Sequence, residues 1–489
     1  MDPEAEASGP QAAGPSAPTP AARAADGAGT SPGAAAGAAV LALACAAQFM
    51  VVLDVSVVNV ALPAVRDDLG FRPSALPWAA GAYALAFGGL LPLGGRLADL
   101  CGHRRVFAAG LVLFGAASLA GGLAAGPGAL VAARAAQGLG AALLAPASLT
   151  VLTTAFPEGP RRARALAVWT AVGLAGGTAG NLLGGLLAQM LSWRWILLVN
   201  VPIAAGAVAA ARVLPPSAPA RREGRLDRAG AVLVTAGPAL LTFGLTRCAE
   251  RGWGDGTAVG ALAAGAVALA AFWPVEARHP DPLIPPRLLR TRSVAVGNTA
   301  MALAGACLQI PMWYFLALSM AGVLGYGPLR TGLAFVPHTV LTLLVGLRVT
   351  PRLMGRVDDR VLIAAGALLA AAGFAWQSRL GPGDGYLTGI LGPAVPLSAG
   401  AGLLTTPLTS LTVAGVPPSD AGAASGLMNT AKQIGGTLGL AALVLPAPGR
   451  SADPQVLAVQ YGHAFLGCAA VLVVLAALTP ALPRPGGVR

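Results

Sequence analysis

Charge is scarce in this 489-residue chain, in which Asp, Glu, Lys and Arg together make up 11% of the residues. A typical soluble domain carries about 25%. Hydrophobic residues make up 55% of the chain, and the mean hydropathy is +0.70. This composition leaves little room for a soluble domain with its own core. It is typical of a protein that crosses a membrane many times.

Several patterns that other function classes need are also missing. The five cysteines form no C-x-x-C pair and mostly lie in apolar stretches, so we expect no disulfide framework and no metal site. The phosphate loop G-x-x-x-x-G-K-[ST] does not occur, which argues against an ATP-driven pump. The histidines are dispersed in the sequence, at His103, His279, His338 and His463. A membrane-embedded enzyme is therefore not expected, nor is a cofactor.

Long hydrophobic runs are what the chain does have. Runs of about 18–25 residues recur between residues 36 and 482, and each is long enough to cross a bilayer. We predict an all-α polytopic protein with fourteen spans, at 36–60, 76–95, 105–125, 129–155, 164–190, 193–213, 229–248, 257–276, 294–321, 329–350, 361–380, 386–413, 421–446 and 460–482.

Two longer polar segments, 215–228 and 278–293, divide these spans into groups of six, two and six. This division predicts a six-helix bundle at 36–213 and a second at 293–482. A linker at 214–292 would add two spans between them. Residues 1–35 are rich in Ala, Gly, Pro and Ser and are expected to form a disordered tail, and residues 483–489 a short second tail.

The net charge of +12 comes from basic residues that are spread unevenly between the two sides of the predicted membrane spans. If the N-terminus is cytoplasmic, 22 of the 32 Lys and Arg residues fall on the cytoplasmic side and 8 on the other, with 2 inside spans. This bias follows the positive-inside rule and predicts that both termini are cytoplasmic in a plasma-membrane protein. We therefore expect contact with the lipid bilayer and no binding of nucleic acid.

Three charged residues lie well inside predicted spans: Asp54, Arg134 and Lys432. A charge at the bilayer centre costs about 2.5–3.5 kcal/mol on insertion scales, so such residues usually face a bundle interior or a cavity. Arg134 cannot release its proton, which makes it the expected electrostatic partner of a protonatable Asp54. The alternative is a static structural ion pair. Lys432 either faces the cavity or extends toward an interface.

Small residues recur at helical spacing within the fifth predicted span. Gly176, Gly180 and Gly184 are four residues apart, and Gly185 follows directly. Such spacing lets the backbones of two helices approach closely. We expect this face to pack against another helix and to permit sliding or bending between conformations.

The segment GGRLADLCGHRR (94–105) resembles the cytoplasmic loop between helices two and three of the major facilitator superfamily. The resemblance implies a conformational role for its motif residues, Gly95, Asp99, Gly102, Arg104 and Arg105. Leu100 stands where the family usually has a basic residue, so Arg104 or Arg105 would have to complete the charge latch. The alternative is that these charges only set the topology.

Four further segments resemble the fourteen-helix drug:proton antiporters of that superfamily. They are LDVSVVNVALPAV (53–65), AARAAQGLGAALLAPA (132–147), SWRWILLVNVPI (192–203) and ASGLMNTAKQIGGTLGLA (424–441). The resemblance covers residues 36–482 and implies two six-helix bundles plus two central helices. It also implies antiport. One departure is Asn181, which replaces a proline of the family's helix-five motif, leaves the backbone ladder intact and adds an amide.

Candidate residues for the substrate cavity are polar or aromatic side chains in the spans, at Asn59, Gln137, Asn181, Gln309, Trp313, Tyr314, His338, Asn429 and Lys432. Gln137 lies three residues from Arg134 and should share its helix face. Trp313 and Tyr314 could form a wall for flat ligands or could be ordinary packing aromatics. His338 could titrate or could be a satisfied interior histidine.

Together these features predict a monomeric, proton-coupled exporter of small organic, drug-like compounds that works by alternating access. Same-fold alternatives are an exporter of an endogenous metabolite or siderophore, or an uptake symporter, because fold alone does not settle the substrate. A passive receptor would have no need of the pairing between Asp54 and Arg134.

Overall fold

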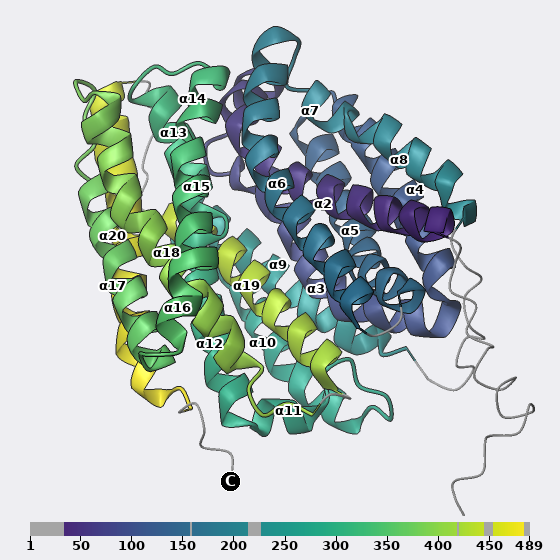
Figure 1. The fold of residues 1–489 in the computed structure, drawn as a ribbon. Coiled ribbons are helices and arrows are strands. Elements are labelled where there is room, and N and C mark those ends of the chain that lie inside the picture. The colour runs from purple at the N-terminus through teal and green to yellow at the C-terminus, as the bar shows by residue number, and fades with distance from the viewer. Residues whose placement is uncertain (1–33, 157–158, 214–225, 418–419, 445–452, 484–489) are drawn as a thin grey trace, which may run out of the picture.

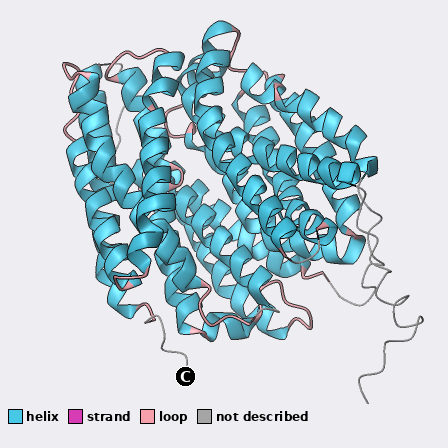
Figure 2. Cartoon of the chain, in the orientation of Figure 1, coloured by secondary structure: helices cyan, strands magenta, loops and turns pink. Residues whose placement is uncertain are grey.

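Helices make up nearly all regular structure in the computed structural model, which describes residues 34–156, 159–213, 226–417, 420–444 and 453–483 (Figure 1). Within these ranges there is no β-strand (Figure 2). Most of the two predicted tails, and most of the polar segment 215–228, lie outside the described residues.

The first six predicted spans coincide with helices, and so do the two linker spans. The helices are α2 (Ala34–Leu69), α3 (Pro77–Cys101), α4 (His103–Gly122), α5 (Pro127–Ala155), α6 (Pro160–Met190), α7 (Trp195–Leu198), α8 (Asn200–Ala210), α9 (Arg228–Arg251) and α10 (Gly256–Arg278). A one-turn 3₁₀ helix, Ala211–Val213, extends α8. The short α11 (Pro286–Arg290) follows the linker.

The C-terminal spans are more interrupted than the sequence predicts. The ninth is split into α12 (Arg292–Leu308) and α13 (Pro311–Gly322), and the tenth into α14 (Pro328–Ala334), α15 (Val336–Leu344), a π turn (Val345–Val349) and α16 (Thr350–Met354). Then follow α17 (Asp359–Gln377), a π turn (Leu387–Leu391), α18 (Gly392–Thr412), α19 (Ala421–Val444), α20 (Pro454–Leu478) and a 3₁₀ turn (Thr479–Ala481). Pro311 accounts for the first break, because proline cannot donate to the helical ladder.

Twelve helices in the described part of the chain are long and apolar enough to cross a membrane. The other two predicted spans correspond to a shorter apolar helix, Trp195–Ala210, and to α19. α19 has 24 residues but carries Asn429, Lys432 and Gln433, which lower its apolarity. The all-helical architecture is thus confirmed, with twelve of the fourteen predicted spans meeting both criteria.

Glycines bring neighbouring helix backbones into direct contact. A Cβ at Gly94 of α3 would overlap the carbonyl oxygen of Ala142 on α5, and one at Gly138 of α5 would overlap the carbonyl oxygen of Tyr83. In the C-terminal half, a Cβ at Gly435 of α19 would overlap the carbonyl oxygen of Ala302. Backbone approach of this kind is how helices associate where hydrophobic burial cannot drive them together.

Two faces of the molecule lie at opposite ends of α3. The Gly70 face carries the turn between α2 and α3, and the Gly102 face carries the turn between α3 and α4, where Gly102 has φ +90°. Non-glycine residues rarely adopt such a value. The helices α2–α8 form one bundle and α12–α20 the other, with α9 and α10 beside the junction (Figure 1).

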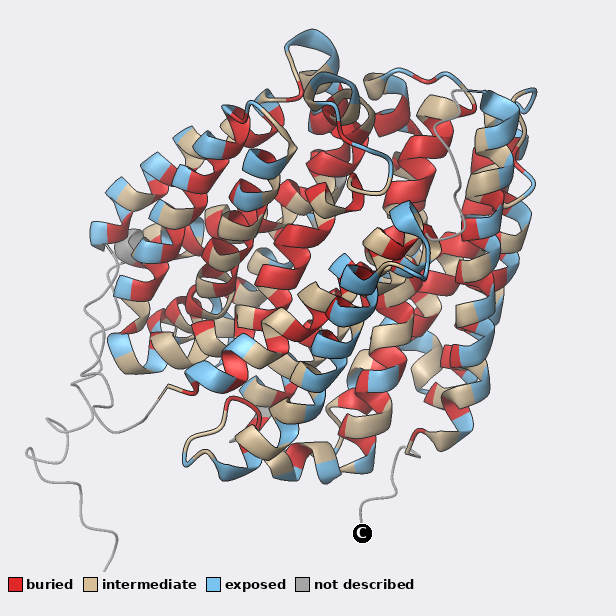
Figure 3. Ribbon diagram, turned by 180° about the vertical axis from the view of Figure 1, so that it is seen from behind, coloured by how far each residue is buried: buried red, intermediate tan, exposed pale blue. Residues whose placement is uncertain are grey.

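The two bundles have their most extensive contacts at three places. α6 packs on α14 and α2 on α13, both toward the Gly70 face, while α3 packs on α19. α9 contacts both α3 and α19, so it lies against this last junction, while α10 packs on α9. Interior faces are buried and outer faces exposed (Figure 3). Only 17% of the most apolar window of α10 is buried, so α10 is the span most available to lipid.

Candidate functional site

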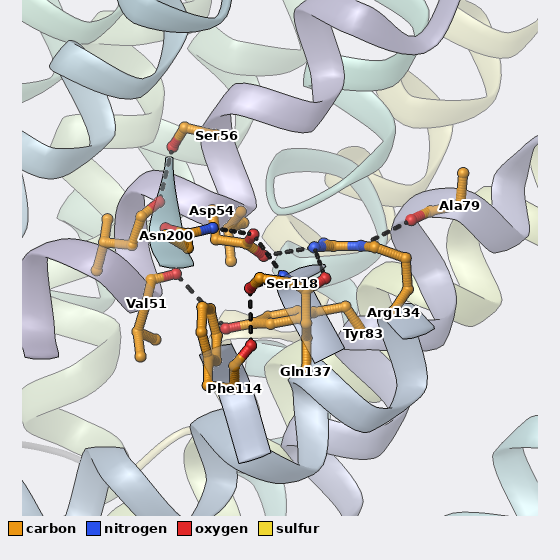
Figure 4. A network of polar contacts seen from close by, with 12 residues as sticks. Val51, Asp54, Ser56, Ala79, Tyr83, Phe114, Ser118, Arg134, Gln137 and Asn200 are labelled. Atoms are coloured by element: carbon orange, nitrogen blue, oxygen red, sulfur yellow. Dashed lines mark hydrogen bonds and ion pairs between the residues drawn. The ribbon is translucent and has the colours of Figure 1, made fainter. Parts of the chain in front are cut away.

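Asp54 lies in the middle of α2 with no solvent exposure. Its carboxylate forms an ion pair with the guanidinium of Arg134 on α5 (Figure 4). The other carboxylate oxygen accepts hydrogen bonds from the amides of Gln137 on α5 and Asn200 on α8, each at 3.0 Å. A buried charge is tolerated only when it is paired and hydrogen-bonded, and Asp54 meets both conditions.

Arg134 is equally well enclosed, with 2% of its surface exposed. Its Nη1 donates to the amide oxygen of Gln137 at 2.8 Å, and its Nε donates to the carbonyl of Ala79 at 3.1 Å. The guanidinium also lies 4.6 Å from the centre of the Tyr83 ring. The contacts with Ala79 and Tyr83 add α3 to the elements that hold the pair.

A third layer of contacts fixes Gln137. Its amide nitrogen donates to Ser118 Oγ on α4 at 2.7 Å, and Ser118 donates to the carbonyl of Phe114 at 2.7 Å. Gln137 and Ser118 have no exposed surface. The buried polar cluster of Asp54, Tyr83, Ser118, Arg134, Gln137 and Asn200 therefore joins five helices of the first bundle. A change in the charge of one member would therefore alter hydrogen bonds or ion pairs in all five helices.

The chemistry available to this cluster is proton binding at one position. Arg134 stays charged, and the serine, glutamine and asparagine do not titrate. Asp54 is the group that can accept a proton, and doing so would weaken the ion pair and change which atoms donate. Asp54 has no solvent exposure in the described conformation.

Sequence reasoning paired Asp54 with Arg134 and placed Gln137 beside them, and the structure brings these three side chains together. It missed Asn200, Ser118 and Tyr83. For Asn200 a signal was present, because it is the one amide in the apolar segment WILLVNVPIAA (195–205). Ser118 and Tyr83 carry no comparable signal, since each is an isolated polar residue in a small-residue helix.

The other predicted cavity residues take no part in this cluster. Asn59 is buried and donates to the carbonyl of Val55 on its own helix at 3.2 Å. Gln309 lies at the break between α12 and α13 and is half-buried, as are Asn429 and Lys432 on α19. Asn429 donates to the carbonyl of Ser425 at 3.0 Å.

The aromatic candidates of the second bundle have different surroundings. Tyr314 is buried and packs edge-on to Phe315, with ring centres 5.2 Å apart. Trp313 is half-buried and lies edge-on to the rings of Phe335 and His338, at 5.2 and 6.4 Å. Tyr314 is thus an interior packing residue, whereas Trp313 retains an accessible surface.

His338 has no solvent exposure. Its Nδ1 lies 3.1 Å from Ser398 Oγ on α18, while its Nε2 has no hydrogen-bond partner among the described residues. The histidine is therefore satisfied on one side of the ring only. Its neighbours are the two aromatic rings and the serine.

The glycine face of α6 packs against α2. A Cβ at Gly176, Gly180 or Gly184 would come within 2.7–3.1 Å of atoms of Phe49, Ser56 or Val57. Gly180 and Gly184 thus lie along the helix that carries Asp54. Any displacement of α2 must slide along this face.

Gly185 and Asn181 lie where α6 meets the second bundle. A Cβ at Gly185 would come within 2.6 Å of the carbonyl oxygen of Pro328, and a Cβ at Gly332 within 2.5 Å of the carbonyl oxygen of Asn181. Gln189, one turn further along α6, accepts a hydrogen bond from the backbone N–H of Leu329 at 3.1 Å. These contacts close the junction of α6 and α14 toward the Gly70 face.

The loop motif at the Gly102 face is mostly solvent-accessible. Asp99 lies 3.9 Å from His103, one turn along the chain, and Arg105 is exposed. Gly102 supplies the left-handed turn between α3 and α4, while a Cβ at Gly95 would be 3.9 Å from Pro146, an ordinary contact. Arg104 is half-buried. The contact of Asp99 is thus with His103, a residue that sequence reasoning did not assign to the latch.

Comparison with known proteins agrees with this architecture. The family model of the Major Facilitator Superfamily matches residues 44–440. The cephamycin export protein CmcT of Amycolatopsis lactamdurans is 55% identical, covering 91% of this chain and 92% of its own. The puromycin resistance protein pur8 of Streptomyces alboniger is 42% identical, covering 84% and 82%.

Among solved structures, an auto-inhibited peptide transporter of the POT family superposes with a TM-score of 0.65 at 14% identity, covering 90% of this chain and 96% of its own. At this identity the likeness shows the fold alone. The sequence match and the shared fold together establish that this chain is a multi-span membrane transporter and belongs to the Major Facilitator Superfamily.

Proposed function

We propose that this protein exports small organic antibiotic-type compounds across the plasma membrane in exchange for protons. The observation that carries the proposal is the buried cluster around Asp54, a protonatable carboxylate held by a permanent cation in the centre of a transporter. The sequence relatives of this protein include proteins named for cephamycin export, puromycin resistance and lincomycin resistance, which supports an organic antibiotic as the cargo.

The proposed orientation assigns each face of the molecule to one side of the membrane. The Gly102 face carries most of the loop arginines, which favours its placement in the cytoplasm. The junction of α6 and α14 is closed toward the Gly70 face. The described conformation thus corresponds to a transporter that receives cargo from the cytoplasm. In this proposal the chain is divided into six, two and six helices, and the two six-helix bundles rock about the junction.

In the proposed cycle, the proton and the cargo stabilise different arrangements of the two bundles. A proton arriving from outside neutralises Asp54 and loosens its ion pair, which permits the α2–α6 interface to move. Return of the proton to the cytoplasm restores the pair. Cargo binding and proton binding favour different arrangements of the bundles, and this difference couples the two flows.

The test uses everted membrane vesicles with an imposed pH gradient, in which export appears as uptake of puromycin or of cefoxitin, a cephamycin that carries a carboxylate. We expect Asp54→Asn to abolish gradient-driven accumulation while leaving exchange of cargo at equal concentrations. Asp67→Asn is the matched control, because it removes the same charge from α2 at an exposed position. Gradient-driven accumulation by Asp54→Asn at the wild-type level would refute the proposed proton site.

A further inference from the structure

Lys432 is the single lysine of the chain and lies in the middle of α19, half-buried. Within the described residues it donates no hydrogen bond and forms no ion pair. Arg134, the other base deep in a span, engages a carboxylate, an amide and a carbonyl. A cation placed in a membrane interior without a partner is costly, which points to a partner that arrives from outside the chain.

Among the described residues, no acid forms an ion pair with Lys432. The acids of the second bundle all lie at helix ends or in loops, at Asp358, Asp359, Asp384, Asp420 and Asp453. Asp54, the acid deepest in a span of the first bundle, is already engaged by Arg134. The two deep bases and one deep acid therefore leave an excess of one positive charge in the interior.

The position of Lys432 on its helix indicates what it faces. Gly422, Ser425, Asn429, Lys432 and Gly436 follow one another at intervals of three or four residues and so share one face of α19. Gly422 and Ser425 are exposed, Asn429 and Lys432 are half-buried, and Gly436 is buried. Exposure thus falls along this face from the Gly102 end inward.

The backbone of Lys432 packs on α12, where a Cβ at Gly305 would come within 2.3 Å of its carbonyl oxygen, and the inner end of this face lies at the break before α13. A Cβ at Gly436 would come within 3.2–3.3 Å of Ile310 and Gln309, at the break before α13, and α13 packs on α2 of the first bundle. On the opposite side of α19, Leu427 packs with Ala231 of α9 and Ile284 of the linker. Lys432 therefore lies at the inner end of a polar face that is open toward the Gly102 side.

We propose that Lys432 binds the anionic group of the exported compound, so that the preferred cargo is an organic anion such as a carboxylate. The inference rests on the proposed export function and specifies its cargo. Three N–H donors on a compact charge suit a carboxylate that enters in varied orientations. Asn429, one turn closer to the Gly102 side, would meet a polar part of the same cargo.

The experiment compares three cargos in everted vesicles under a pH gradient: cefoxitin, its neutral methyl ester, and puromycin, which carries an amine and no acid. Lys432→Gln removes the charge and Lys432→Arg retains it. Arg379→Gln, in an exposed loop, controls for the loss of one positive charge from the protein. A second readout measures thermal stabilisation of the purified wild-type protein by cefoxitin and by its ester, so the test does not depend on folding of a variant.

We expect Lys432→Gln to raise the half-saturating concentration of cefoxitin about tenfold or more, with the ester and puromycin changed less than about twofold. Lys432→Arg should retain most cefoxitin transport, and cefoxitin should stabilise the wild type more than the ester does. Equal losses for all three cargos, or equal stabilisation by acid and ester, would overturn the proposal. Transport of puromycin but not of cefoxitin by the wild type would overturn it while leaving export intact, whereas transport of neither would count against the export function itself.

Discussion

Asn200, the first residue of α8, donates a 3.0 Å hydrogen bond to Asp54, although the two residues are 146 positions apart. The bond connects the last helix of the first bundle to the carboxylate at its centre. Asn200 is thus one of the two amides that donate to the buried carboxylate of Asp54.

Replacing Asn200 by Val should therefore lower gradient-driven export. The variant removes one of the two amide donors to the Asp54 carboxylate, and hydrogen bonds to a charged group are typically worth about 1.5–3 kcal/mol. The measurement is the initial rate of cargo uptake into everted vesicles. Asn59→Val is the matched control, because the Asn59 amide bonds its own helix; equal rates for Asn200→Val and wild type would argue against the role of Asn200.

Breaking the central ion pair should cost more than removing it whole. Arg134→Gln leaves Asp54 buried without a counter-charge, and such losses typically amount to about 3–5 kcal/mol. The double variant Asp54→Asn with Arg134→Gln should recover much of this stability. Thermal unfolding in detergent measures the stability of the single and the double variant. Arg66→Gln, which breaks an exposed pair with Asp67, should cost about 0–1 kcal/mol. A double variant no more stable than Arg134→Gln would show that the unpaired charge of Asp54 is not what destabilises Arg134→Gln.

Two adjacent glycines of α3 should respond differently to the same substitution. Gly94→Ala would drive a methyl group into the carbonyl oxygen of Ala142, and overpacking of this kind costs about 1–3 kcal/mol. Gly95→Ala meets only Pro146, at 3.9 Å, and should be tolerated. Equal melting temperatures for the two variants would contradict the close approach of α3 and α5.

The closed junction of α6 and α14 should open when it is overfilled. Gly332→Val would clash with the carbonyl of Asn181, whereas Gly327→Ala adds a methyl 3.5 Å from Gln189 and should be harmless. In a chain freed of its five cysteines, a cysteine at position 309 serves as the reporter. We expect an impermeant thiol reagent applied at the Gly70 face to label it faster in Gly332→Val. Unchanged labelling would mean that these contacts do not close that side.

The ion pair of Arg287 and Asp420 should add a pH-dependent term to stability. Arg287 donates to Asp420 at 2.7 and 3.0 Å, and these hydrogen bonds hold the pKa of the carboxyl below its usual 3.8. A lowered pKa contributes stability that is present above the usual value and is lost as the pH falls through the lowered one. The difference in melting temperature between wild type and Arg287→Gln should therefore be largest near neutrality and shrink below about pH 4. A constant difference at all pH values would exclude this cause.

Much of the fold could be predicted from local patterns. Runs of apolar residues mark the spans because the bilayer requires them, and the pairing of Asp54 with Arg134 followed from two motifs and the cost of burying a charge. The breaks at Ile310 and Phe335 were not predicted, since proline is tolerated inside several other helices here, for example at Pro146 and Pro238. Whether a proline breaks a span depends on neighbouring helices, which a single sequence does not display.

The remaining members of the cluster depend on tertiary packing. Ser118 reaches Gln137 because Gly140 of α5 lies against Phe114 of α4. The local sequence of either helix does not encode this register. Likewise an arginine was the expected partner of Asp99, whereas the structure places His103, across the Gly102 turn, 3.9 Å from its carboxylate.

The contacts of α9 with both α3 and α19 have a genetic consequence. Thr430 of α19 donates a 2.5 Å hydrogen bond to the carbonyl of Gly88 on α3, and Thr235 of α9 packs against Gly89 beside it. The bundles are joined here by noncovalent contacts among three helices, independently of the peptide that connects them. A gene cut in two after α10 would accordingly encode two fragments able to assemble. The first fragment would carry α9 and α10, and its α9 would contact α19 of the second.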